Sequence, residues 1–169
     1  MRYNTCVPEH TNWLEIDLNA LQHNARVIAQ HLGAARTLWA VVKADAYGHG
    51  ATQITSALLQ AGVSHFVVAS LGEAIELREA LRDLPFRLMM LYPPAAPDDW
   101  RVAAEYGVEC VVDSIVGYHQ ACAIAEMLGR ALPVHLEIDT GMSRLGLAPV
   151  QIEPFLTEFR PDAPLRWQS

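Results

Sequence analysis

Short apolar runs alternate with segments of helical periodicity along most of this 169-residue chain. Six runs have the length and composition of strands, and their starts lie 22 to 31 residues apart: 38–43, 65–69, 87–91, 109–112, 133–138 and 164–167. Several are almost continuously apolar, which is typical of parallel strands buried on both faces. The pattern predicts a series of strand–helix units.

Helical patterns with recognisable ends separate these runs. The predicted helices cover 18–32, 51–61, 74–84 and 118–128. Asp17 and Gly33 are expected to cap the first helix, and Ser70 with Glu73 forms a capping box before the third. Pro154 interrupts the pattern after residue 138, so a helix there is predicted to begin only at this proline.

Repeated strand–helix units indicate an α/β fold with a parallel sheet, either an open doubly wound sheet or a (β/α)8 TIM-type barrel. A complete barrel needs eight units and about 250 residues. This chain has five units and the beginning of a sixth, so a barrel would be incomplete. We expect two parts, an N-terminal segment with its leading helix at 1–37 and the strand–helix region at 38–169.

Composition narrows the class of protein. Hydrophobic residues make up 51% of the chain, and 12 basic against 19 acidic residues give a net charge of −7. This acidic globular composition argues against a disordered chain, and against a partner such as nucleic acid or a membrane surface. Residues 46–72 lack charges but are too polar and glycine-rich for a membrane span. Three cysteines, an odd number without a CxxC pair, and no apolar leader predict a reduced, cytoplasmic protein.

The segment 40–50, AVVKADAYGHG, carries the strongest chemical signal. Lys43 is the only lysine of the chain and lies at the predicted carboxyl end of a strand, where α/β folds place their active sites. An amine there can act as a nucleophile toward a carbonyl, and pyridoxal phosphate is the commonest carbonyl cofactor. The alternative interpretation is that Lys43 is an ordinary surface lysine at the end of a strand. From their sequence context alone, Tyr47 would be interpreted as a packing aromatic and Arg144 as a solvated loop residue.

This segment resembles the cofactor-binding signature of alanine racemases, which are fold-type III pyridoxal-phosphate enzymes. Three further segments resemble that family in its order: WLEIDLNALQHN at 13–24, VASLGEAIELR at 68–78 and HLEIDTGMSRLG at 135–146. The resemblance implies a TIM-type barrel with five to six units present. It also implies that the family's C-terminal β-domain lies outside this sequence.

The resemblance assigns roles residue by residue. Lys43 would form the internal aldimine with pyridoxal 5'-phosphate and serve as one of two bases at the substrate Cα. Tyr47 would reach the cofactor phosphate, and Arg144 the region of its phenolic oxygen. Glu137 occupies a position where many members carry a carbamylated lysine, so its carboxylate is expected to support Arg144. Asp45, His49 and His135 match no metal-ligand spacing, and no metal is expected.

The resemblance implies interconversion of L- and D-alanine, with the second base, a tyrosine, supplied by the partner subunit of a homodimer. Two alternatives stay open. One is a racemase for another amino acid such as serine or lysine. The other is a non-catalytic remnant that binds cofactor without turnover.

Overall fold

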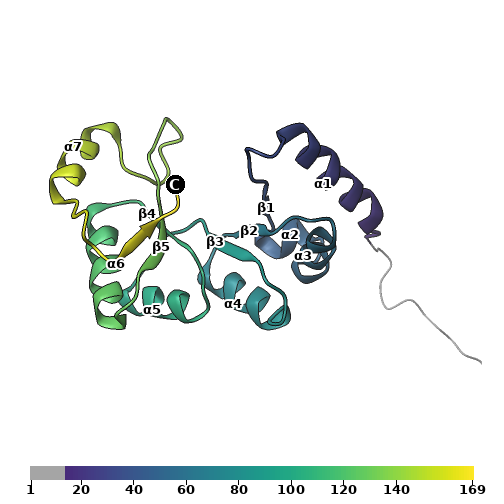
Figure 1. Cartoon of the computed structure of the whole chain (residues 1–169), viewed down its shortest axis with the longest axis horizontal. Coiled ribbons are helices and arrows are strands. Elements are labelled where there is room, and N and C mark those ends of the chain that lie inside the picture. The colour runs from purple at the N-terminus through teal and green to yellow at the C-terminus, as the bar shows by residue number, and fades with distance from the viewer. Residues whose placement is uncertain (1–13) are drawn as a thin grey trace, which may run out of the picture.

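The computed structural model describes residues 14–169 and contains six parallel strands (Figure 1). They are β1 Trp39–Val41, β2 His65–Val68, β3 Arg87–Met90, β4 Cys110–Val112, β5 Leu132–Leu136 and β6 Leu165–Trp167. Two three-stranded sheets, β1-β2-β3 and β4-β5-β6, are joined by a parallel bridge between Met89 and Glu109. The Glu109 N–H donates to the Leu88 carbonyl at 2.8 Å, and the Met90 N–H donates to the Glu109 carbonyl at 3.0 Å.

Strand order decides between the two predicted architectures. The strands follow one another in chain order from β1 to β6, without the reversal that defines a doubly wound sheet. The connecting helices α3, α4, α5 and α6 lie along the outer side of the curved strands (Figure 1). Parallel strands wound in one direction with helices outside are the arrangement of a TIM-type barrel, here present in part, as predicted.

Residues 14–169 contain seven helices, α1 Leu18–Leu32, α2 Lys43–Gly48, α3 Ala51–Gln60, α4 Leu71–Ala80, α5 Pro97–Glu105, α6 Ile115–Leu128 and α7 Pro149–Glu158. The predicted first cap is confirmed, because Asp17 Oδ1 accepts from the N–H groups of Asn19 and Ala20 at 2.9 and 3.0 Å. Ser70 Oγ likewise accepts from the Glu73 N–H at 3.4 Å. Each side chain therefore satisfies amide donors that the helix itself leaves free.

Two helices differ from the prediction. The sequence pattern did not predict α5. The first turn of this helix, Pro97-Asp98-Asp99, is polar, although the helix buries Trp100 directly after it. Pro and Asp are favoured in a first helical turn, so this segment did carry a start signal. α7 begins at Pro149 and contains Pro154, so the prediction that a helix begins only at Pro154 was wrong.

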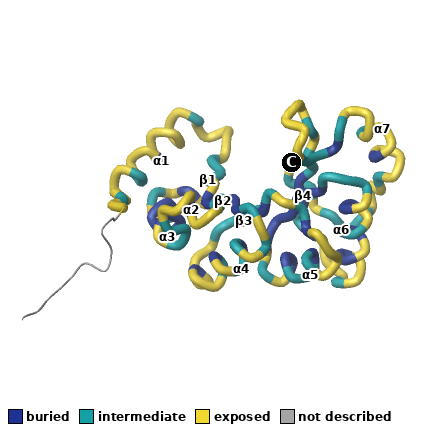
Figure 2. Tube along the Cα trace, turned by 180° about the vertical axis from the view of Figure 1, so that it is seen from behind, coloured by how far each residue is buried: buried dark blue, intermediate teal, exposed yellow. Residues whose placement is uncertain are grey.

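The core lies between the strands and the outer helices. Buried strand residues such as Phe66, Val68, Leu88 and Val134 pack there, and Figure 2 shows burial concentrated in the strands and on the inner sides of α4, α5 and α6. β4 is buried throughout, as predicted. β3 alternates: Leu88 and Met90 are buried, whereas Arg87 and Met89 on its other face are only partly buried.

α1 contacts α3 through the side chain of Gln22. The Gln22 side-chain amide donates to the Ala57 carbonyl at 3.0 Å and to Gln60 Oε1 at 3.1 Å. Ala25 is the one α1 residue classed as buried, and the exposed length of this helix is visible in Figure 2. Across residues 14–169, none of the helices has the length and apolar character needed to cross a bilayer.

Candidate active site

The backbone after β1 forms a left-handed helical turn. Ala44, Asp45, Ala46 and Tyr47 have φ values of 51°, 53°, 52° and 58°. A left-handed conformation brings Cβ close to the next carbonyl and costs roughly 1–2 kcal/mol for each non-glycine residue. Lys43 therefore begins this strained turn rather than ending the strand, which stops at Val41.

Contacts on both sides of the turn hold it in place. The Ala46 N–H donates to the Val42 carbonyl at 2.9 Å, at the exit from β1. Asp45 Oδ1 accepts from the Ala51 N–H at 2.7 Å and so satisfies a free donor at the start of α3. The His49 ring donates from Nδ1 to the Ala46 carbonyl at 2.7 Å. Strain of this kind persists only where the surrounding structure fixes it, and such places are often functional sites.

Lys43 directly precedes the left-handed turn, and Tyr47 is the last of its four residues. Lys43 is partly buried, whereas 59% of the Tyr47 surface is exposed. Within residues 14–169, neither the Lys43 amine nor the Tyr47 hydroxyl takes part in a hydrogen bond or ion pair. Both polar groups are therefore free to meet a ligand.

The other predicted site residues follow β5. Asp139 Oδ1 accepts from the N–H groups of Gly141 and Ser143, both at 2.9 Å, and these hydrogen bonds lower the pKa of the Asp139 carboxyl. The Leu147 N–H donates back to the Glu137 carbonyl at 2.8 Å and closes the loop. Arg144 is exposed in this loop.

Glu137 lies in a poorly compensated position. Its Oε2 atom is buried and has no hydrogen-bond partner among the described residues. Burial raises the pKa of Glu137, the Asp113 charge raises it further, and the Arg144 charge acts in the opposite direction. The influence of Arg144 is through its charge, because within residues 14–169 the two side chains form no hydrogen bond or ion pair.

A cluster that sequence reasoning missed lies on the inner face of the strands. Arg87 donates from Nε and Nη2 to the two carboxylate oxygens of Glu109 at 2.5 and 2.6 Å. His135 Nε2 lies 2.9 Å from Glu109 Oε2. Burial alone would raise the pKa of the Glu109 carboxyl, but the hydrogen bonds from His135 and Arg87 and the charge of Arg87 lower it to about 2. Because an ionised carboxylate only accepts, His135 donates from Nε2.

This cluster did have a sequence signal. Arg87 and Glu109 are each the first residue of a predicted strand, and these two strands follow one another along the chain. Opposite charges at equivalent places in neighbouring parallel strands are expected to meet. The cluster is a candidate for stabilising the barrel interior.

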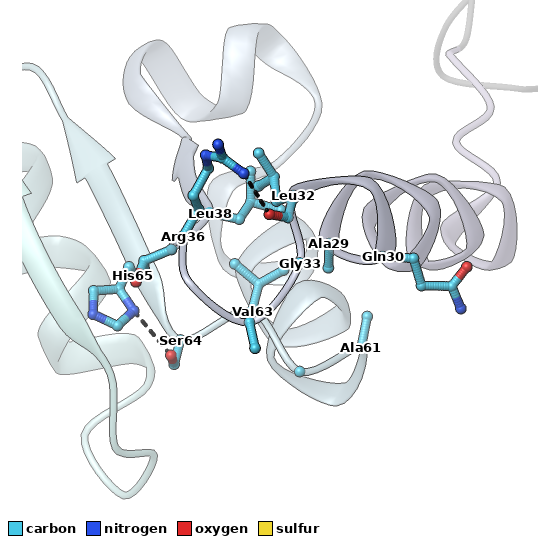
Figure 3. Close-up of a pocket in the computed structure, with 13 residues that line it drawn as sticks. Ala29, Gln30, Leu32, Gly33, Arg36, Leu38, Ala61, Val63, Ser64 and His65 are labelled. Carbon is cyan, nitrogen blue, oxygen red and sulfur yellow. Dashed lines mark hydrogen bonds between the residues drawn. The ribbon is translucent and has the colours of Figure 1, made fainter.

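A cavity of about 590 Å³ lies between the last turn of α1 and the segment before β2 (Figure 3). The Arg36 guanidinium donates to the Leu32 carbonyl at 3.1 Å there, and Ser64 Oγ lies 2.9 Å from His65 Nδ1. Leu32 and Arg36 precede β1, and Ser64 and His65 lie at the start of β2. The cavity therefore lies at the amino edge of the sheet. Lys43 follows the carboxyl end of β1, and the cavity is therefore separate from the candidate site.

Asp45, His49 and His135 are each engaged locally, with the Ala51 N–H, the Ala46 carbonyl and Glu109 respectively. In the described part of the chain, no three His, Cys, Asp or Glu side chains gather as metal ligands.

Comparison with known proteins places this geometry in a family. The family model for the N-terminal domain of alanine racemase matches residues 16–168. The alanine racemase of Synechocystis sp. is 43% identical over 134 residues, which are 79% of this chain and 36% of that protein. The alanine racemase of Brucella suis is 41% identical over 143 residues, 85% of this chain and 35% of the relative.

Solved structures agree. The alanine racemase from Bacillus anthracis with bound L-Ala-P has a TM-score of 0.80 and 30% identity, covering 93% of this chain and 40% of that one. A histidine racemase from Leuconostoc mesenteroides has a TM-score of 0.75 and 27% identity, covering 88% and 39%. The chain thus spans little more than a third of the length of its curated relatives. With a family match over nearly its whole length, the chain belongs to the alanine racemase N-terminal domain family.

Proposed function

We propose that this chain is the cofactor-binding part of a pyridoxal-phosphate-dependent alanine racemase, which interconverts L- and D-alanine. The observation that carries the proposal is that Lys43 stands directly before the left-handed turn after β1 and Tyr47 at its last residue, with both polar groups free of partners within residues 14–169. Lys43 is the only lysine, so its amine is the one side chain able to condense with an aldehyde.

The groups present fit pyridoxal phosphate chemically. A primary amine suits the aldehyde, a hydroxyl donor suits a phosphate oxygen, and a guanidinium suits an anionic ring oxygen. The Glu137 Oε2 atom, just after β5 at the same carboxyl edge of the sheet, is buried and accepts no hydrogen bond from the described residues. It is therefore an acceptor that a ligand could use. When bound, the cofactor supplies an electron sink for the pair of electrons left at Cα after proton loss.

In this proposal the Lys43 amine would hold the cofactor, and once the substrate amine had replaced it there, the freed amine would exchange a proton at the substrate Cα. Tyr47 would donate its hydroxyl hydrogen to a phosphate oxygen, and its exposure leaves room for that group. Arg144 would donate to an anionic oxygen of the cofactor. Glu137 supports Arg144 by its negative charge rather than by contact, as the effect of Arg144 on the Glu137 pKa suggests.

The proposal includes a homodimer, in which the partner subunit supplies the opposing base. It also includes a cytoplasmic location. The location is supported by Cys110 and Cys122, which are buried free thiols. Buried unpaired cysteines are typical of proteins kept in a reducing compartment.

The test is reductive trapping. The chain is incubated with pyridoxal phosphate and borohydride, and the adduct is located by peptide mass spectrometry. We expect saturable labelling of Lys43 in preference to the N-terminal amine, the only other primary amine, and its loss in Lys43→Arg. Labelling of Lys43 no better than that of the N-terminus would contradict cofactor binding.

A second candidate is a racemase for another amino acid, favoured by the structural likeness to a histidine racemase. Exchange of the Cα proton with deuterated water, followed by NMR on alanine, serine, lysine and histidine, separates the two. Preferential exchange of alanine supports the first candidate. Labelling of Lys43 without any exchange would support the non-catalytic remnant.

A further inference from the structure

The Glu73 carboxylate joins the turn that carries Lys43 to the end of the neighbouring strand. Glu73 Oε1 accepts from the Ala44 N–H at 2.9 Å, across 29 residues of sequence. Its Oε2 accepts from the Ala69 N–H at 2.7 Å, directly after β2. A glutamate at this place in a capping box would normally accept from the N–H of the capping residue, here Ser70. Glu73 instead bridges two different strand ends.

The chemistry of the bridge requires a carboxylate. Both partners are N–H donors, so the side chain must present two acceptors at once, and an ionised carboxylate has only acceptors. A glutamine would accept one N–H and turn its own NH₂ group toward the other. Aspartate has the charge but is one methylene shorter, so it would not span both donors.

The Ala44 N–H belongs to the peptide unit that starts at the Lys43 carbonyl. Fixing this amide fixes the Lys43–Ala44 peptide plane, and with it the direction in which the Lys43 side chain leaves the backbone. The four left-handed residues begin at this same point. The hydrogen bond from the Ala44 N–H to Glu73 therefore restrains the strained turn at the residue that directly follows Lys43.

We propose that Glu73 is the positioning residue for Lys43, holding the backbone from which its side chain leaves in place for capture of the phosphate-bearing cofactor. This inference rests on the proposed function. Glu73 acts through the backbone of the turn and touches no reacting atom.

The first test needs no cofactor, and its decisive measurement is made on the unsubstituted chain. Amide hydrogen exchange of the unsubstituted chain, read by NMR, should show Ala44 and Ala69 protected. In Glu73→Gln at least one of these amides should exchange roughly tenfold or more faster, as expected on loss of a charge-assisted hydrogen bond. An unprotected Ala44 amide in the unsubstituted chain would overturn the inference outright.

The second test follows Lys43 itself. Reductive trapping with pyridoxal phosphate at low concentration should be roughly tenfold slower in Glu73→Gln. Reductive methylation of Lys43 with formaldehyde, which has no phosphate to position, should change less than twofold. Equal changes in both rates would indicate a purely structural role and overturn the proposal.

Two variants of the same helix serve as controls. Glu76→Gln makes the same chemical change at an exposed α4 position whose carboxylate has no hydrogen bond in the described part of the chain. Ser70→Ala removes the helix cap and leaves the Glu73 carboxylate in place. Both should trap pyridoxal phosphate at the unsubstituted rate, and slow trapping in Ser70→Ala would overturn the inference.

The outcomes separate the two proposals. If the unsubstituted chain does not label Lys43 selectively, the proposed function fails, and the inference fails with it. If the unsubstituted chain labels Lys43 and Glu73→Gln labels it equally fast, the inference alone fails.

Discussion

Arg87 and Glu109 form a two-pronged ion pair across neighbouring strands, with Nε and Nη2 of the guanidinium 2.5 and 2.6 Å from the two carboxylate oxygens. The Glu109 side chain is 6% exposed and that of Arg87 41%. The carboxylate is thus removed from water while its partner remains half in it. Such a carboxylate depends on its hydrogen bonds to stay ionised.

Glu109 should make the stability of the chain sensitive to acid. Its folded-state pKa of about 2 lies below the ordinary value of 4.5. Its stabilising contribution is therefore complete above about pH 4.5 and is lost as the pH falls toward 2. Glu109→Gln should cost roughly 2–3 kcal/mol at pH 7 and reduce the slope of stability against pH in that window.

Urea unfolding at pH 7 and pH 3 measures this effect. The matched control is Glu105→Gln, which removes the exposed Arg101–Glu105 pair at 2.6 Å and should cost less than about 1 kcal/mol. Equal losses for the two variants at pH 7 would contradict the role given to Glu109.

Tyr47→Phe should weaken cofactor capture and leave stability unchanged. The hydroxyl is free of partners within residues 14–169, so its removal breaks no contact there. The loss of one hydrogen bond to a charged phosphate should raise the pyridoxal phosphate concentration for half-maximal Lys43 trapping roughly tenfold. Tyr92→Phe, another exposed tyrosine near a strand end, is the control. An unshifted titration in Tyr47→Phe would remove Tyr47 from the proposed site.

Glu137→Gln should stabilise the chain while impairing cofactor capture. The pKa of Glu137 is raised above its ordinary value, so this residue favours folding below the unfolded-state pKa and loses that contribution as the pH rises through the folded one. At pH 7 its charge opposes folding. Its neutralisation should therefore raise Tm.

Thermal unfolding and reductive trapping are measured on the same Glu137→Gln sample. A lower Tm would mean that the negative charge is compensated in the folded chain. Unchanged trapping would count against a role in supporting Arg144.

Asp45 should contribute to stability through its acceptor oxygen rather than its charge. Asp45→Ala loses the hydrogen bond to the Ala51 N–H and should cost about 1–2 kcal/mol. Asp45→Asn keeps an acceptor and suits the positive φ of 53°, so it should cost less than half as much. Urea unfolding of both variants provides the comparison, and equal losses would assign the effect to charge.

Local sequence patterns predicted most of the secondary structure because they depend only on neighbouring residues. The alternation of apolar runs located all six strands, and the caps at Asp17 and Ser70 were read directly. α5 was missed because its first turn is polar, and the start of α7 was misplaced because the helix was expected to begin at Pro154, which lies inside it. Both errors concern helices anchored by a few buried side chains, such as Trp100 and Phe155.

The sequence by itself determined the family, the strand–helix order and the place of Lys43 in the segment that follows the first strand. The tertiary structure alone decided the left-handed turn, since four non-glycine residues with positive φ have no local signal and are held by Glu73, 29 residues away from Ala44. It also decided that Glu109 pairs with Arg87 and His135, whereas Glu137 and Arg144 form no contact among the described residues. The physical reason is that periodicity specifies which face a residue occupies, while strand register and curvature specify which side chains meet there.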